Sequence, residues 1–131
     1  QMIAVYGDGF VSLEGTTDGA LKTQNERERK TVTSAPIEID GEGDTTIVTG
    51  VPGQKIKLTS IMFTVKGETN ITFMNGAAAI TGPMDFGADG EPSGMVSNHG
   101  FLPYEFTEEA SFVINLVGAA VVSGYVTGYI E

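Results

Sequence analysis

A chain of 131 residues fits one domain and can bury a single ordinary hydrophobic core. It contains no cysteine, which excludes disulfides, thiolate nucleophiles and zinc–thiolate sites. Its formal net charge of −10 disfavours nucleic-acid partners, because duplex binding depends largely on Lys and Arg side chains that neutralise phosphates.

No apolar run approaches the roughly 18 residues of a transmembrane helix, so we expect no membrane partner. The N-terminus lacks the basic-then-apolar pattern of a signal peptide. Gln1 in place of Met indicates a start that was processed, trimmed or engineered.

In residues 1–35, apolar and polar residues alternate poorly. This segment also holds most of the chain's intermixed basic and acidic residues. A short apolar start at residues 2–6 precedes a Gly-Asp-Gly turn, and a second apolar segment follows at residues 10–13. Residues 18–33 are mostly polar. We interpret residues 1–35 as an N-terminal arm or extended loop that contacts a partner and is ordered by what it touches. The alternative is an edge strand and a long loop of the same domain.

From residue 36 to residue 131 the pattern is that of short strands separated by turns. Residues 36–40 alternate apolar and charged, as a strand with one buried face does, residues 41–44 form a polar turn, and residues 45–49 form the next strand. Further runs rich in Val, Ile, Thr, Phe and Tyr lie at residues 56–65, 70–74, 112–117 and 121–130. About eight strands with regular turns predict an all-β fold, a single antiparallel β-sandwich of jelly-roll type.

The last strand presents two different faces. Val122, Val126 and Ile130 share one face with two glycines, which leave room for the close approach of a large side chain or another backbone. Tyr125 and Tyr129 lie on the opposite face, which is amphipathic and suits a subunit interface. The alternative is that a loop half covers the two tyrosines.

The residue types that support catalysis are sparse. His99, the one histidine, lies in a small polar turn without a nucleophile elbow nearby, so we expect a structural or surface role. Glu108 and Glu109 are adjacent, so on a strand they would point to opposite faces, and in a turn they would be solvated. Distant carboxylate pairs can hydrolyse glycosides, but the chain has no Trp to stack on a sugar. We expect no enzyme activity and no cofactor.

Two groups of carboxylates superficially resemble metal ligands. The spacing of Asp40, Glu42 and Asp44 is that of the start of a calcium loop, but the sixth and twelfth positions lack the required Gly and Glu. We therefore predict a polar hairpin turn there, with a loose surface calcium site as the alternative. The second group, formed by Asp85, Asp89 and Glu91, is interpreted in the same way.

The order of strands and turns in about residues 50–131 resembles that of a known family. Its elements are Asn70-Ile71-Thr72-Phe73, the turn Thr81-Gly82-Pro83-Met84, Ala88-Asp89-Gly90, Leu102-Pro103-Tyr104 and the closing strands. This order resembles small β-sandwich proteins of tailed-phage virions, including capsid decoration (cement) proteins of jelly-roll type. The resemblance covers about residues 50–131, and the Thr-Gly-Pro-Met turn is its sharpest element. The N-terminal portion usual in that family is not visible in residues 1–35.

The resemblance implies a non-enzymatic structural protein, often trimeric, that binds the outside of a phage capsid and stabilises the shell. Its expected partners are the major capsid protein and other copies of itself, and it is expected in the host cytoplasm during assembly. The residues that we predict to contact partners are Ile3, Val5, Tyr6, Phe10, Val11, Leu13, Arg27, Arg29, Tyr125 and Tyr129. The alternatives are a tail, baseplate or receptor-binding β-sandwich and a small hydrolase or carbohydrate-active domain.

Overall fold

The computed structural model describes residues 3–6, 9–12, 32–100 and 102–131. The chain divides into two compact units, Gln1–Lys30 and Thr31–Glu131. Each unit is described by itself.

In the first unit, the described residues form an antiparallel pair of short strands. Strand β1 (Ile3–Tyr6) pairs with β2 (Gly9–Ser12), and Tyr6 lies opposite Gly9. The sequence predicted an arm in which these two apolar segments contact a partner. Within the described part, they supply backbone hydrogen bonds to each other. Residues 13–31 of the predicted arm lie outside the described residues.

The second unit is built from strands, with one short 3-10 turn at Ala88–Gly90. The strands of this unit are β3 (Thr33–Val48), β4 (Ile56–Lys66), β5 (Thr69–Asn75), β6 (Ala78–Ala79), β7 (Met84–Phe86), β8 (Ser93–Asn98), β9 (Tyr104–Glu105) and β10 (Phe112–Ile130). All of their pairings are antiparallel. The predicted all-β antiparallel fold is therefore confirmed. No helix in the described part of the chain is long and apolar enough to cross a membrane.

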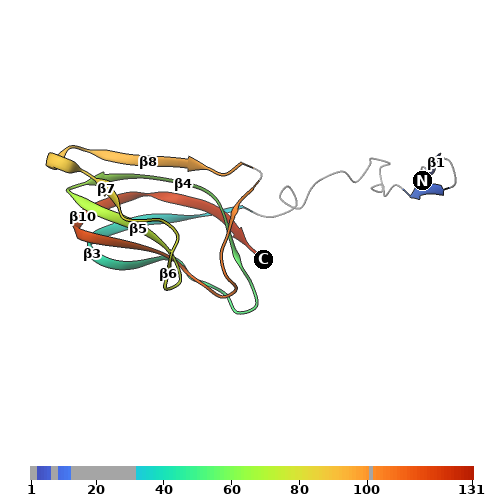
Figure 1. Cartoon of the computed structure of the whole chain (residues 1–131), viewed down its shortest axis with the longest axis horizontal. Coiled ribbons are helices and arrows are strands. Elements are labelled where there is room, and N and C mark those ends of the chain that lie inside the picture. The colour runs from blue at the N-terminus through green and yellow to red at the C-terminus, as the bar shows by residue number, and fades with distance from the viewer. Residues whose placement is uncertain (1–2, 7–8, 13–31, 101) are drawn as a thin grey trace. The chain divides into compact units, whose positions relative to one another are not determined.

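The eight strands form one sheet that folds over into two layers (Figure 1). Strand β10 is shared by both layers: its first half pairs with β5 and its second half with β4. Strand β3 pairs with β10 along both halves. Layer 1 thus contains β5 with β6 and β7 on its outer edge, and layer 2 contains β4 with β8 and β9 on its outer edge. This arrangement is a β-sandwich in which two long strands pass from one layer to the other.

Glycines allow β3 and β10 to bend between the layers. Gly41 and Gly43 of β3 and Gly118 of β10 have φ values of 129°, 102° and 103°, which side chains with a Cβ rarely adopt. The register between β3 and β10 shifts at this bend. The buried hydroxyl of Thr69 donates to the Gly118 carbonyl at 2.8 Å, so the bend satisfies polar groups that it would otherwise leave unpaired.

Two sequence predictions are wrong at this bend. Residues 41–44 were predicted as a hairpin turn between two strands, but they are the middle of one strand, β3. Residues 112–117 and 121–130 were predicted as two separate strands, but both belong to β10, which runs continuously through Gly118. The reason is that a glycine with positive φ can either end a strand or bend it, and the partner strand decides which occurs.

Alternation along the strands places the core between the layers. Ile37 and Ile39 are buried, while Glu38 and Asp40 between and after them are exposed, as the sequence predicted. Aromatic rings join the layers: Phe63 of layer 2 meets Phe73 of layer 1 edge-to-face, with ring centroids 6.0 Å apart. The remaining fully buried large side chains are Phe106, Phe112, Ile61, Ile71, Ile114, Val65, Val122 and Val126.

A β-bulge interrupts the pairing between β4 and the end of β10. The register shifts between Thr127 and Gly128, so Thr59 of β4 is an extra residue opposite this step. The hydroxyl groups of Thr59 and Thr127 lie 2.8 Å apart and share a hydrogen bond. This bond satisfies the buried Thr59 and holds the register of the strands on both sides of the bulge.

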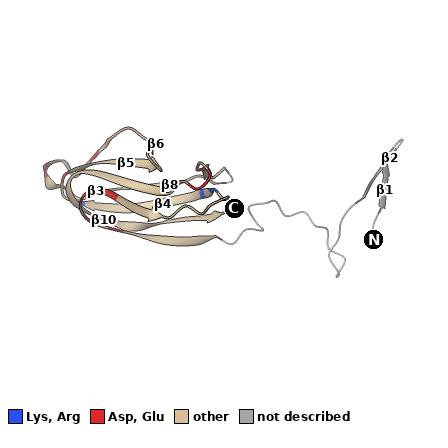
Figure 2. Ribbon diagram, turned by 90° about the horizontal axis from the view of Figure 1, so that it is seen from below, with Lys and Arg blue, Asp and Glu red and all other residues tan. Residues whose placement is uncertain are grey.

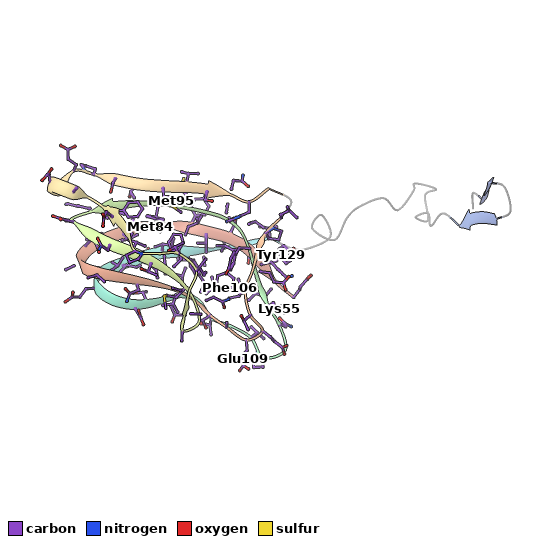
Figure 3. All side chains as sticks on the ribbon, viewed as in Figure 1. Lys55, Met84, Met95, Phe106, Glu109 and Tyr129 are labelled. Carbon is purple, nitrogen blue, oxygen red and sulfur yellow. The ribbon has the colours of Figure 1, made fainter. Side chains whose placement is uncertain are left out.

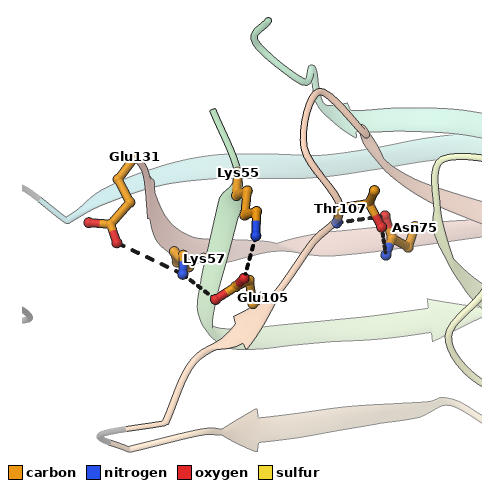
Figure 4. A network of polar contacts seen from close by, with 6 residues as sticks. All are labelled: Lys55, Lys57, Asn75, Glu105, Thr107 and Glu131. Atoms are coloured by element: carbon orange, nitrogen blue, oxygen red, sulfur yellow. Dashed lines mark hydrogen bonds and ion pairs between the residues drawn. The ribbon is translucent and has the colours of Figure 1, made fainter. Parts of the chain in front are cut away.

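Lys55, Lys57 and Glu105 form an ion-pair network where β9 pairs with β4 (Figure 4). The Lys55 Nζ lies 2.9 Å from one carboxylate oxygen of Glu105, and Lys57 donates to the other oxygen. These hydrogen bonds, from Lys57 first and then Lys55, lower the pKa of Glu105 from 4.5 to about 2. The same contact with Glu105 raises the pKa of Lys55.

The depressed pKa of Glu105 predicts an acid-dependent contribution to stability. A carboxyl group with a lowered folded-state pKa stabilises the fold above its ordinary value of 4.5, and this contribution is lost as the pH falls toward about 2. We therefore expect the difference in urea midpoint between wild type and Glu105→Gln to shrink from pH 6 to pH 2.5. High salt should also reduce it, because the groups are exposed. Glu42→Gln, on the exposed side of β3, is the control; an equal pH dependence in both variants would contradict this assignment.

Candidate protein-binding face

A row of exposed apolar side chains crosses the outer surface of layer 2. Tyr125 of β10 lies directly opposite Pro36 of β3 on one side and Met62 of β4 on the other. Met62 in turn lies opposite Val96 of β8. Side chains directly opposite each other on neighbouring strands point to the same face, so these four form one continuous row. We call it the apolar row; with strands about 4.8 Å apart it extends roughly 14 Å.

The members of the apolar row are accessible to a partner. Val96 is 74% exposed, Tyr125 42% and Met62 41%. Their neighbours in sequence on β4 and β8 point inward: Ile61 and Phe63 are buried, and Met95 packs against the core. The rigid inner side of the sheet therefore holds the outer side chains in place, which lowers the entropy lost when a partner binds.

Mostly small, uncharged residues flank the apolar row on both sides. On one side of the apolar row, the adjacent row is Ser34, Thr127, Ser60 and Asn98. On the other side, the adjacent row is Glu38, Ser123, Thr64 and Gly94. We call these three rows together the outer face.

The charge of the outer face contrasts with that of the rest of the domain. From Thr31 onward the chain has three lysines and no arginine against 12 acidic residues, a net charge of −9. Within the outer face, Glu38 is the one charged residue. In Figure 2, Asp and Glu are red and most of the sandwich ribbon is tan. A sheet surface with so little charge in so acidic a domain can be covered by protein without desolvating many carboxylates.

The composition of the outer face is that of a protein interface. Interface cores are depleted of charged residues and enriched in aromatic residues and Met, and Tyr125 and Met62 lie at the centre of the row. Aromatic residues near the centre of an interface commonly contribute much of its binding energy.

Of the partner-contact residues predicted from the sequence, Tyr125 lies on this face. Tyr129 is on the same strand beyond the bulge, opposite Lys57, and it is only partly exposed. Ile3, Val5 and Tyr6 lie on β1, and Phe10 and Val11 lie on β2. The two tyrosines belong to the second unit, and the five residues on β1 and β2 belong to the first. Leu13, Arg27 and Arg29 lie outside the described residues.

Sequence reasoning missed Pro36, Met62 and Val96. One available signal was the alternation of β4, in which Met62 occupies an outward position between Ser60 and Thr64. That signal marks an outward-pointing Met but does not pair it with Tyr125. The pairing depends on the register among β10, β4 and β8, which the linear sequence does not show.

The residues considered for chemistry fall at separate places. His99 follows β8, and its backbone N–H donates to the Thr59 carbonyl at 2.9 Å. Glu108 and Glu109 are exposed in a turn, as predicted for a turn. Asp40, Glu42 and Asp44 lie along β3 and do not form the predicted hairpin turn; Asn115 donates to Asp44 at 2.6 Å. In the part of the chain that the structure describes, three or more His, Asp or Glu side chains do not converge on a possible metal position.

Comparisons with known proteins give no relative. No family model, curated protein or solved structure matches this chain. Its function must therefore be inferred from the residues and their arrangement.

Proposed function

We propose that this protein is a non-enzymatic structural protein that binds the outside of a tailed-phage capsid through the outer face of layer 2. The observation that carries the proposal is the apolar row on a face that is almost free of charge. The capsid as partner follows from the resemblance of residues 50–131 to decoration proteins. In this role the protein stabilises the shell and sits on the exterior of the virion.

The charge distribution supports a protein partner on the shell exterior. Most carboxylates of residues 31–131 lie away from the outer face, so they remain in water when the face is covered. Their negative charge repels the nucleic acid inside the shell. The outer face supplies the short-range apolar contact that the acidic surface does not.

Several copies are proposed to act together on one shell. Contacts that are linked bind at a high effective concentration, so a trimer that touches several capsid subunits gains avidity without any stronger single contact. The part of the predicted arm that precedes β3 is proposed to add contacts to the major capsid protein or to another copy. Assembly onto the shell takes place in the host cytoplasm in this proposal.

Co-sedimentation with decoration-free capsids of the source virus tests the proposal. We expect saturable pelleting by the wild-type protein and a loss of at least about 30-fold in affinity for Val96→Lys, because burying an unpaired ammonium group is costly. Val117→Lys is the matched control. Val117 is 63% exposed on the same kind of strand surface, but it lies at the bend of β10, outside the outer face.

The possible outcomes test the role of the outer face, the role of the arm and the identity of the partner separately. Equal capsid binding by Val96→Lys and wild type would remove the outer face from the proposal, and equal loss in both lysine variants would indicate a general effect of charge. Deleting residues 1–30 tests the arm; full retained affinity would exclude it. Pelleting with isolated tails but not with capsids would identify a tail, baseplate or receptor-binding component.

A further inference from the structure

A cavity of about 270 Å³ lies between the two layers, on the side away from β3. Its inner wall is formed by core side chains, among them Leu58 and Ile61 of layer 2 and Phe73 and Phe112 of layer 1. Met95 of β8, in layer 2, and Met84 of β7, in layer 1, also belong to its lining (Figure 3). The cavity thus occupies the opening where the edge strands of the two layers come together without pairing.

The cavity is large for a domain of this size and almost entirely apolar. Protein interiors pack as densely as organic crystals and contain few voids larger than a water molecule. An apolar cavity of about 150 Å³ stays dry and binds benzene. The cavity here is larger than that, it is open to solvent on one side, and its walls are mainly carbon.

The walls combine rigid and adaptable parts. Phe73 and Phe112 pack edge-to-face with centroids 5.7 Å apart, and both are buried, so this wall is fixed by the core. Met84 and Met95 are only partly buried and pack against the core from the edge strands. Unbranched thioether side chains can change rotamer to admit and enclose an apolar molecule. A site with one rigid wall and a flexible entrance accepts ligands of varied shape.

A few polar groups line the cavity together with the carbon atoms. Thr81, Ser97 and His99 belong to the lining. The Thr81 hydroxyl accepts a hydrogen bond from the Phe73 N–H at 3.1 Å, and a hydroxyl that accepts one bond can still donate its own proton. The main chain of His99 is held by hydrogen bonds to Thr59 and Leu102, which fix this residue at the lining of the cavity. These groups can hydrogen-bond one polar end of an otherwise apolar ligand.

We propose that this cavity binds an uncharged, largely apolar small molecule that carries one hydroxyl or carbonyl group. No Lys or Arg belongs to the lining, and residues 31–131 carry a net charge of −9, so a carboxylate or phosphate would be repelled. The site is distinct from the outer face, because its residues point inward from strands whose outward residues form that face. Ligand binding there is independent of the proposed capsid contact.

Methionine-methyl NMR on the intact protein tests the proposal with 1-octanol as the probe. We expect the methyl signals of Met84 and Met95 to shift along one saturable curve. Met62, on the outer face, and Met74, whose neighbour Phe73 points inward, should not move. Octanoate at pH 7 should bind at least tenfold more weakly than 1-octanol. Absent or unsaturable shifts, or equal shifts at Met62, would overturn the site, and equal binding of octanoate would overturn the preference for an uncharged ligand.

A pair of variants on β8 provides a second readout. Ser97 belongs to the cavity lining and Val96, beside it in sequence, points to solvent. Ser97→Phe should reduce 1-octanol affinity at least tenfold by filling the cavity, whereas Val96→Phe should leave it within twofold. Thermal melting of both variants verifies that the fold persists. Unchanged affinity in a folded Ser97→Phe variant would overturn the proposal, and if that variant does not fold, the methyl shifts of the wild type decide.

Discussion

Phe63→Ala is expected to lower the free energy of unfolding by about 3–5 kcal/mol. Phe63 is 2% exposed and contacts two rings of the opposite layer, with centroids 6.0 Å from Phe73 and 5.4 Å from Phe86. Its removal eliminates contacts that hold layer 2 against layer 1 and leaves a void that rigid neighbouring strands cannot fill. Since single domains are stable by about 5–15 kcal/mol, this one change should remove a large share of the total.

Urea denaturation followed by circular dichroism measures this effect. Val96→Ala is the control on a neighbouring strand, because Val96 is 74% exposed and its truncation should change the free energy of unfolding by less than about 0.5 kcal/mol. A loss below about 1 kcal/mol in Phe63→Ala would show that the layers are not held together by this aromatic contact.

Gly124→Ala is expected to destabilise the domain by about 1–3 kcal/mol or more, although it adds only one methyl group. Gly124 lies on β10 opposite Phe63 of β4, and a Cβ built there would be 1.9 Å from the Met62 carbonyl oxygen. The clash is with backbone, so no rotamer change can relieve it and the strands must move apart. The sequence predicted that this face admits the close approach of another group; the group is the backbone of β4.

Gly82→Ala is the matched control for the glycine prediction. A Cβ at Gly82 would meet nothing within 4 Å, and its φ lies outside the left-handed range. The same substitution there should be neutral or slightly stabilising, because Ala has less conformational freedom than Gly in the unfolded chain. Thermal unfolding of the two variants compares them directly. An equal effect at both positions would mean that the packing of β10 on β4 is looser than the structure indicates.

Most strands could be predicted because their evidence is local. The alternation of Ile37 and Ile39 with Glu38 and Asp40 follows from the period of a strand with one buried face, and it appears in the structure as predicted. The tracts at residues 56–65 and 70–74 became β4 and β5 with almost the same bounds. The bends at Gly43 and Gly118 were predicted as breaks between strands. A glycine indicates that the backbone can adopt a positive φ, but it does not show whether strand pairing continues beyond it.

The candidate site was predicted only in part. Tyr125 could be placed on an outward face from the pattern of β10 alone. Its alignment with Met62 and Val96 depends on two registers between strands distant in sequence. The cavity behind them depends in addition on the edge strands of the two layers, which do not pair with each other. No local pattern encodes either property.

The sequence by itself determined the class of the fold, the absence of thiol chemistry and the acidic character of the domain. These properties follow from composition and from periodicity within single strands, which short-range sterics and burial dictate. The tertiary structure decided that β3 and β10 each serve two layers, and that four side chains from four strands form one apolar row. Strand pairing joins residues far apart in the chain, and register shifts at the bend and the bulge set which side chains meet. For this reason the proposed binding surfaces became visible only in the folded chain.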